Sequence, residues 1–154
     1  MKHETRNSKL EILFVCLGNT CRSPMAEGLF NKLSSEKGLS VTASSAGLGA
    51  FNGAHAAANA VSVMAQQGID ITKHRARLLD EEIIKAANLV LVMEGSQIEA
   101  IPEIYKEKVH LLSEYASGAA EDIFDPIGGG LDTYQNCANL IEKHLINLLK
   151  HLQS

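Results

Sequence analysis

Three features are scarce in this sequence: cysteine, long apolar runs and an excess of positive charge. The sequence has only 3 cysteines, and none of them forms a Cys-x-x-Cys pair. This excludes a secreted disulfide framework and a Cys-x-x-Cys metal site. No apolar run approaches the roughly 20 residues that span a bilayer, so we expect no membrane partner. The formal net charge is −4, whereas nucleic-acid binders carry a basic surface, so we expect no nucleic-acid partner either.

The start of the chain differs in composition from the rest. Residues 1–9 are polar, mixed in charge and without the apolar core of a secretory signal. We expect them to form a flexible leader, followed by a single domain over residues 10–154. Hydrophobic residues make up 45% and charged residues 21%, which is typical of a soluble globular protein. A few unpaired cysteines also predict a cytoplasmic location, where thiols stay reduced.

Short apolar runs alternate with amphipathic segments along the chain. Strands are predicted at residues 11–15, 40–46, 88–93 and 108–112, and helices from Ser23-Pro24 onward and at residues 55–67, 79–87 and 131–152. This alternation predicts βαβ units and a parallel sheet covered by helices on both faces. Ligands of such sheets bind at the carboxyl ends of the strands, so the loop after the first strand is the expected site.

That loop, residues 16–22, reads Cys-Leu-Gly-Asn-Thr-Cys-Arg and leads into a helix. Ser23 can cap the helix, and Pro24 is favoured in its first turn. Successive N–H groups of such a loop can turn inward as an anion nest, beside the positive end of the helix dipole. Gly18 permits unusual backbone geometry and Asn19 tolerates a left-handed one. The loop therefore predicts a phosphate site.

Five residues separate Cys16 from Arg22. The planar guanidinium of Arg22 can hold two phosphate oxygens, and together with the loop N–H groups it stabilises a thiolate on Cys16. Such a thiolate beneath a phosphoryl group is an in-line nucleophile, to which Ser23 can donate a hydrogen bond. The alternative is that Cys16 is a small core residue at a strand end. The strand before the loop and the helix start after it favour the catalytic interpretation.

The segment from Val15 to Glu27, VCLGNTCRSPMAE, closely resembles the phosphate loop of the low-molecular-weight protein tyrosine phosphatases. The similarity continues in family order through Ser44-Ser-Ala-Gly47, His74-Arg-Ala-Arg77, residues 89–93 and Asp125-Pro126, and it covers nearly the whole chain after the leader. The resemblance implies a four-stranded parallel sheet flanked by helices. It also implies a protein phosphatase without metal or cofactor, whose partners are phosphorylated proteins or peptides and inorganic phosphate.

The resemblance also implies roles for individual residues. Cys16 is the nucleophile, Arg22 the phosphate clamp, and Asp125 the acid that protonates the leaving group and then activates water. The phosphate-binding set is Leu17, Gly18, Asn19, Thr20, Cys21, Arg22 and Ser23. Ser45 and His74 resemble the residues that support the loop; without the resemblance they would be a strand-end serine and a surface histidine. Asp122 is interpreted as a solvated loop acid.

The sequence departs from the family pattern in ways that bear on the substrate. Asp125-Pro126 is usually followed by an aromatic wall residue, but here Ile127 and three glycines follow. We expect the substrate walls to be Leu48, Phe51 and Ile127. Tyrosine phosphatases of this family tend to carry Ile or Val where this loop has Thr20. Thr20 and the glycines resemble the protein arginine phosphatase branch, so phosphoarginine is favoured over phosphotyrosine as substrate.

Two other activities fit the same loop. A thiol-dependent arsenate reductase needs resolving cysteines on a mobile segment, and only Cys137, in a predicted helix, lies in the second half. A phosphocysteine carrier would pass the phosphoryl group on without hydrolysis, and the combination of Arg22 with Asp125 argues against it. A phosphate-binding module without catalytic activity is the remaining alternative.

Overall fold

The computed structural model describes residues 10–153; the predicted leader at residues 1–9 lies outside this range. The first element, β1, spans Leu10–Cys16 and is fully buried from Ile12 onward. An apolar run with branched residues forms a strand readily when both faces are covered, because every side chain then meets a packed layer. Cys16 is the last residue of this strand, so the loop that follows starts at its carboxyl end.

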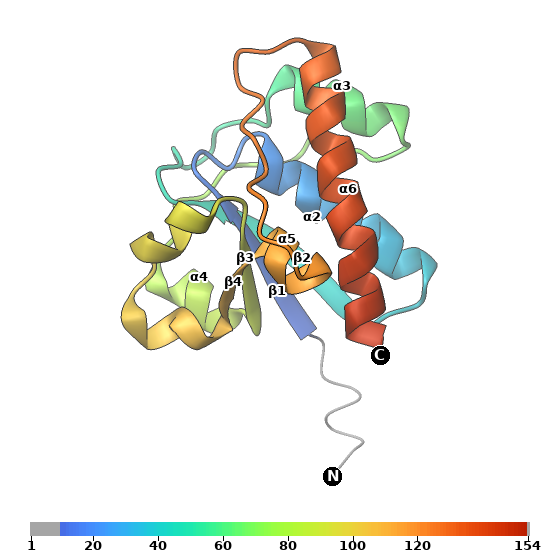
Figure 1. Ribbon diagram of the computed structural model, residues 1–154. Helices are drawn as coiled ribbons and strands as arrows, with labels where there is room; N and C mark the ends of the chain where they lie inside the picture. The colour runs from blue at the N-terminus through green and yellow to red at the C-terminus, as the bar shows by residue number, and fades with distance from the viewer. Residues whose placement is uncertain (1–9, 154) are drawn as a thin grey trace.

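The sheet has four parallel strands in the order β2-β1-β3-β4, with β2 at Val41–Gly47, β3 at Leu89–Val92 and β4 at Val109–Leu111. This confirms the predicted fold class. In the register of β1 and β2, Cys16 lies opposite Gly47. On the other side of β1, Val15 pairs with Val92 near the end of β3. The carboxyl ends of β1, β2 and β3 therefore lie together at Cys16. Figure 1 shows the three strands side by side.

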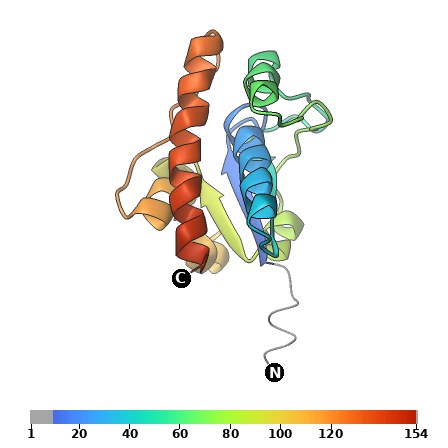
Figure 2. The same ribbon diagram turned by 90° about the vertical axis from the view of Figure 1, so that its right-hand side faces the viewer.

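Helices cover both faces of the sheet. On one face lie α2 at Arg22–Glu36, α3 at Ala58–Gln66, α5 at Leu112–Ser117 and α6 at Leu131–Gln153. Figure 2 shows α2 and α6 side by side. The other face is covered by α4 at Glu81–Ala86 and by two short 3₁₀ helices, η1 at Gly95–Ala100 and η2 at Glu103–Lys108. No helix in the described residues has the length and apolar character needed to cross a membrane.

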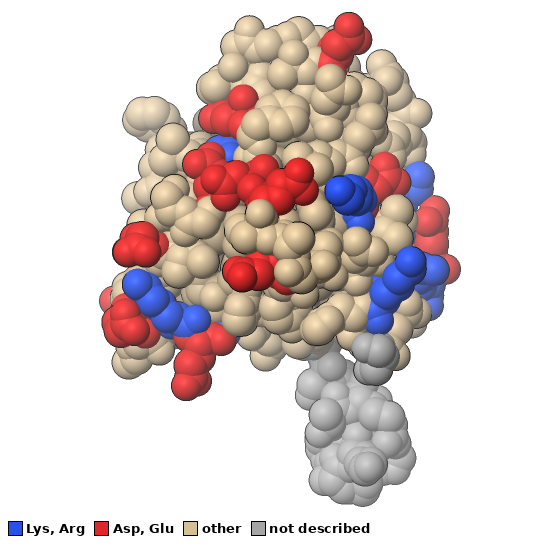
Figure 3. All heavy atoms as spheres, in the orientation of Figure 1, with Lys and Arg blue, Asp and Glu red and all other residues tan. Residues whose placement is uncertain are grey.

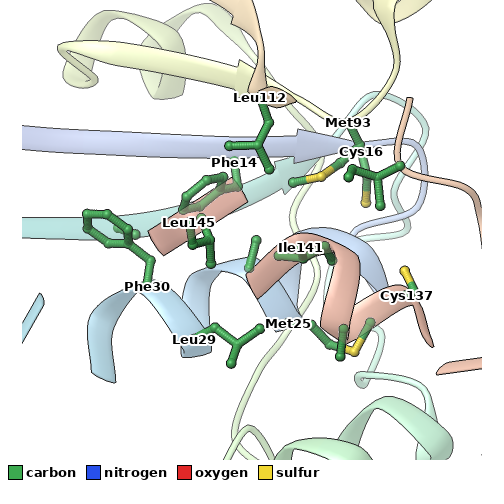
Figure 4. Packing of buried hydrophobic residues seen from close by; sticks show 14 of the residues in the cluster. Phe14, Cys16, Met25, Leu29, Phe30, Met93, Leu112, Cys137, Ile141 and Leu145 are labelled. Carbon is green, nitrogen blue, oxygen red and sulfur yellow. The ribbon is translucent and has the colours of Figure 1, made fainter. Parts of the chain in front are cut away.

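Alternate side chains of β1 enter two separate cores. Ile12 and Phe14 point to the face of α2 and α6, whereas Leu13 and Val15 point to the face of α4. Figure 4 shows Phe14 beside Phe30 of α2 and Leu145 of α6. The two phenyl rings meet edge-on, with centroids 5.9 Å apart, a geometry that adds to the stabilisation from burial. Because both cores hold β1, the end of this strand is a rigid base for the loop.

Several predicted boundaries were wrong for local reasons. The helix after the loop begins at Arg22 with Cys21 as its N-cap residue, and Ser23 lies inside the first turn. Ser23 cannot cap because its hydroxyl bonds the Cys16 sulfur. The helix predicted from residue 55 begins at Ala58. His55 instead forms a bridge with Arg75. The short elements η1, η2 and α5 were not predicted.

Candidate active site

A pocket of about 240 Å³ opens where β1 ends. It is lined by the whole loop from Cys16 to Arg22 and by Gly49, Phe51, Ala54, Asp125 and Ile127. Cys16 is only 2% exposed at the base of this loop. The structure therefore brings the three residues assigned to catalysis, Cys16, Arg22 and Asp125, together around one pocket.

The backbone carbonyls of the loop are bonded by the surrounding chain. Cys16 O accepts from Leu48 N at 3.0 Å, Leu17 O from Gly49 N at 2.8 Å, Asn19 O from His74 Nε2 at 2.7 Å, and Thr20 O from Ala57 N at 2.9 Å. Most N–H groups of the loop, in contrast, have no hydrogen-bond acceptor within residues 10–153. Among the described residues, those of Leu17, Gly18, Thr20, Cys21 and Arg22 donate to no protein acceptor. A row of unpaired N–H groups at a helix start is an anion nest.

Asn19 holds the loop in shape. Its backbone is left-handed, with φ 57°, a conformation that Asn adopts more readily than other non-glycine residues. The backbone N–H of Arg77 donates to Asn19 Oδ1 at 2.9 Å. Because a backbone N–H can only donate, this bond fixes which end of the amide is the oxygen. The amide nitrogen must then donate, and it does so to Ser23 Oγ at 2.8 Å and Ser45 Oγ at 3.0 Å.

These bonds direct a hydrogen toward the Cys16 sulfur. Ser23 Oγ lies 2.9 Å from Cys16 Sγ, and it already accepts from the Asn19 amide. When Cys16 is a thiolate, Ser23 is the only one of the two that can donate. The backbone N–H of Asn19 points at the same sulfur at 3.3 Å. A sulfur anion at Cys16 would thus accept from two donors. Ser23 does not line the pocket, so it acts on the sulfur rather than on bound phosphate.

The support extends outward through residues that the sequence pattern did not single out. Ser45 Oγ accepts from Asn19 and donates to Glu27 Oε1 at 2.6 Å. Arg77 Nε donates to Ser45 O at 2.8 Å. The ring of His74 donates to the Asn19 carbonyl. Ser45 and His74 therefore both bond the loop residue Asn19, whereas the carboxylate of Glu27 and the side chain of Arg77 were not assigned a role from the sequence.

Gly47 also shapes the loop, although the sequence pattern assigned it no such role. A Cβ at this position would lie 2.7 Å from Leu17 O and 2.9 Å from Asn19 N, closer than non-bonded atoms can pack. Only glycine allows the loop to approach the end of β2 this closely. Gly18 was expected to need its special freedom, but its φ is not left-handed and an added Cβ would meet only Thr20 Oγ1 at 3.7 Å. The strained position is occupied by Asn19 instead.

Arg22 is buried and held from behind. Its Nη1 donates to Glu94 Oε2 at 2.5 Å and to Ile123 O at 2.8 Å. Both hydrogens on Nη1 are therefore used, and Nη2 and Nε remain for a ligand. The guanidinium of Arg22 is 2% exposed, so its pairing with Glu94 offsets the cost of burying the charge. Glu94 could not be found from local sequence as the partner of Arg22, because it lies 72 residues away.

Asp125 sits above the loop on a segment fastened at several points. Ile123 is fully buried, and its N–H donates to Met93 O at 2.8 Å. Asp122 Oδ1 accepts from Gly95 N at 2.9 Å, so this residue anchors the segment instead of being only solvated. Asp125 Oδ1 accepts from Ile127 N, and its Oδ2 lies 3.6 Å from Arg22 Nη2. The Asp125 side chain is 39% exposed, so water can reach it.

The rim of the pocket is apolar. Phe51 is 83% exposed, Ile127 69% and Leu17 56%, and all three line the pocket. Leu48, which was predicted to be a wall, does not line it. Its side chain packs against the opposite core near Leu79. Leu48 contributes to the loop through its backbone instead, because its N–H donates to Cys16 O. Thr20 lines the pocket, and its hydroxyl makes only a 3.8 Å contact with Cys21 Sγ.

The other two cysteines are poorly suited to react. Burial raises the pKa of the Cys21 thiol, although a hydrogen bond with the Tyr134 hydroxyl at 3.3 Å acts in the opposite direction. Burial raises the pKa of Cys137 to about 12. Cys137 is fully buried in α6, with its sulfur directed at Phe124 O. A thiol must ionise to attack, so both cysteines are weaker nucleophiles at neutral pH than a free one.

Charges on the surface bear on the expected partners. The face drawn in Figure 3 carries more acidic than basic side chains, and no continuous basic surface crosses it. A phosphate backbone would find no matching surface on this face. Within the part of the chain that the structure describes, no group of three or more His, Cys, Asp or Glu side chains is arranged to hold a metal ion.

Comparison with known proteins assigns the class. Residues 11–154 match the family described as low molecular weight phosphotyrosine protein phosphatase. The chain belongs to this family of cysteine-based protein phosphatases, as the resemblance predicted, and the family implies phosphoprotein substrates.

The relatives include phosphatases of two specificities. A protein-arginine-phosphatase of Bacillus subtilis is 38% identical over 147 residues, covering 94% of this chain and 97% of the relative. A probable low molecular weight protein-tyrosine-phosphatase of Ralstonia nicotianae is 39% identical over 132 residues, covering 86% of this chain and 88% of the relative. A solved arginine phosphatase, a mutant with a phosphorylated serine in its active site, superposes with a TM-score of 0.91 at 37% identity, covering 94% and 97% of the two chains. Overall identity does not separate the two specificities.

Proposed function

We propose that this protein hydrolyses phosphorylated side chains through a phosphocysteine on Cys16. In the first step the Cys16 sulfur attacks phosphorus in line, the bond from phosphorus to the leaving atom breaks, and protonated Asp125 gives that atom its proton. The observation that carries the proposal is the set of unpaired N–H groups in the loop that lines one pocket together with Cys16. They can donate to the phosphoryl oxygens, as can Nη2 and Nε of Arg22.

In the second step water attacks the phosphocysteine. Asp125, now a carboxylate, takes a proton from the water, and the Cys16 thiolate leaves. Ser23 assists by donating to the departing sulfur from 2.9 Å. The charge on the transferred group is neutralised by N–H groups and Arg22, so we expect turnover without metal or cofactor. Since the nucleophile must remain reduced, the proposal places the enzyme in the cytoplasm.

For the substrate we propose phosphoarginine, on the basis of Thr20. A phosphoarginine brings planar N–H donors close to phosphorus, and these need acceptors inside the pocket. The Thr20 hydroxyl lines the pocket and makes no hydrogen bond to the loop backbone in the described structure. It is therefore available to accept from a substrate N–H. Leaving such a donor buried without a partner costs about 1–3 kcal/mol.

Phosphotyrosine is the second candidate, and the rim of the pocket favours it. The exposed ring of Phe51 and the apolar side chains of Leu17 and Ile127 offer surface for a phenyl group. The other candidates lack such support. An arsenate reductase needs a mobile resolving thiol, and Cys137 is buried inside α6. A carrier has no use for Asp125 beside the clamp Arg22.

The test compares catalytic efficiency on matched peptides that carry phosphoarginine or phosphotyrosine. We expect the wild type to prefer phosphoarginine. Thr20→Val and Thr20→Ile, which lack the hydroxyl, are expected to shift the kcat/KM ratio toward phosphotyrosine by at least about tenfold, or roughly 1.4 kcal/mol. Thr20→Ser keeps the hydroxyl and serves as the control. If the ratio stays the same in Thr20→Ile, the reason for preferring phosphoarginine is removed and the tyrosine phosphatase assignment stands.

A further inference from the structure

A second hollow, of about 300 Å³, lies behind the loop support and shares no lining residue with the catalytic pocket. Its wall is built from the segment that follows α3 and from the end of β2. The lining residues are Glu27, Ser44, Ser45, Lys73, His74, Arg75 and Arg77. Three permanent cations thus face one carboxylate in a protein whose net charge is −4. Such a local reversal of charge attracts small anions.

Several donors in this hollow have no acceptor within the described chain. The Lys73 ammonium makes no hydrogen bond, and Arg77 uses only its Nε, which donates to Ser45 O at 2.8 Å. Arg77 Nη1 and Nη2 are free, as is the Ser44 hydroxyl. Arg75 Nη1 donates to the carbonyls of His74 and Thr72, which leaves its other nitrogens available. A guanidinium fork beside an ammonium and a hydroxyl matches a tetrahedral oxyanion.

We propose that this hollow binds a free tetrahedral oxyanion, of which inorganic phosphate is the one released by the proposed reaction, and that occupancy lowers turnover. The hollow reaches the residues that hold the loop. Ser45 Oγ donates to Glu27 and accepts from Asn19. Arg77 donates to Asn19 Oδ1 and to Ser45 O. Two or three hydrogen bonds therefore link the hollow to the Cys16 sulfur.

The direction of the effect follows from competition for donors. An oxyanion in the hollow attracts the Arg77 guanidinium away from the Ser45 carbonyl, because a charged acceptor binds a cation more strongly than a neutral carbonyl does. It also competes with Glu27 for the Ser45 hydroxyl. Either change loosens Asn19 and the donors aimed at the sulfur. Such loosening lowers kcat, whereas an anion in the catalytic pocket competes with substrate and raises KM only.

The binding test uses sulfate as the probe and amide chemical shifts as the readout, in the full chain. We expect two groups of shifts with separate saturation curves, one at residues 17–22 and one at residues 44–45 and 73–77. In the Lys73→Ala/Arg75→Ala variant the second group should vanish while the first persists, which also shows that the variant is folded. A single saturation curve confined to residues 17–22 would overturn the site. This arm does not depend on the substrate or on turnover.

The kinetic test measures p-nitrophenyl phosphate hydrolysis with and without sulfate, at ionic strength matched with sodium chloride. We expect saturating sulfate to lower the wild-type kcat by at least about twofold, in addition to raising KM. In Lys73→Ala/Arg75→Ala only the rise in KM should remain. Lys37→Ala/Lys143→Ala loses the same charge outside the hollow and should behave as wild type. If sulfate changes KM alone in the wild type, or lowers kcat equally in both double variants, the proposed coupling is wrong.

Discussion

The amide of Asn19 shows how one side chain sets the chemistry of another. Arg77 N–H fixes its oxygen, so its nitrogen must donate to Ser23 and Ser45. Ser23 then has its own hydrogen available for the Cys16 sulfur. Because each bond in such a chain polarises the next, the donors act together. An aspartate at position 19 would have no N–H to give and would remove both donations at once.

The nucleophile is tested by Cys16→Ser. We expect this variant to lose turnover, because a serine hydroxyl ionises far less readily than a thiol. The side chains are nearly the same size, so the thermal unfolding midpoint should stay close to that of the wild type. Turnover of p-nitrophenyl phosphate and circular dichroism melting are the measurements. Activity above a few per cent of wild type would contradict the assignment of Cys16.

Asp125→Ala tests the general acid. We expect kcat to fall by about 10²–10⁴-fold on phosphoarginine or phosphotyrosine peptides, the usual loss for this role. Substrates with good leaving groups need less protonation, so the loss in kcat/KM should be smaller for p-nitrophenyl phosphate. Asp132→Ala is the control, because its side chain is exposed in the first turn of α6 and does not line the pocket. An equal loss on poor and good leaving groups would show that Asp125 does not protonate the leaving atom.

At the scale of elements, the loop depends on how closely β2 approaches it. Gly47→Ala would place a Cβ 2.7 Å from Leu17 O and 2.9 Å from Asn19 N. Since both neighbours are backbone atoms, the loop itself must move. We expect kcat/KM to fall by about tenfold or more, because displacements near 1 Å in a catalytic group have costs up to about 10²-fold.

Gly130→Ala is the matched control for that change, because an added Cβ there has no neighbour within 4 Å. It should retain activity close to wild type. The two variants are compared by kcat/KM and by vanadate binding, which reports the shape of the loop without turnover. Equal activity of the two variants would show that the loop tolerates displacement at the end of β2.

Local sequence predicted the elements whose signals are local. β1 is an unbroken apolar run from Ile12 onward, and α6 has a 3.6-residue apolar period over 23 residues. The elements η1, η2 and α5 are six residues each, too short for a period to show. The Ser23 cap was wrong because a hydroxyl that is favourable at a helix start is bonded here to the nucleophile. A local sequence pattern does not reveal when a side chain makes a tertiary hydrogen bond in place of the local one.

The site was predictable to the extent that its residues form a motif. Cys16, Arg22 and Asp125 were assigned from short matches to the family and line one pocket. Glu94 and the side chain of Arg77 were not found, because they act on Arg22 and on the Ser45 carbonyl, which lie 72 and 32 residues away. Long-range partners of this kind depend on strand order, which a single sequence does not specify.

At the scale of the whole molecule, stability and activity depend on different parts of the fold, the core and the loop at residues 16–22. Two neighbouring residues of α6, one buried and one exposed, can test this difference. Leu145 is fully buried against the face of β1 that carries Phe14 (Figure 4), whereas Ile146 is 42% exposed. We expect Leu145→Ala to lower the free energy of unfolding by about 2–5 kcal/mol, from lost burial and the cavity left behind. Ile146→Ala should change it by less than about 0.5 kcal/mol, as exposed positions do. Urea unfolding at 25 °C measures both.

We expect Leu145→Ala and Ile146→Ala to differ in stability but not in activity. The loop is held by Asn19, Ser45 and Gly47, and none of these residues touches Leu145 through a hydrogen bond. We therefore expect the folded Leu145→Ala enzyme to keep the wild-type kcat/KM at low temperature, while its melting temperature falls by about 4–20 °C. The control Ile146→Ala should match wild type in both measurements. A large loss of kcat/KM in folded Leu145→Ala would instead show that packing of α6 against β1 sets the geometry at Cys16.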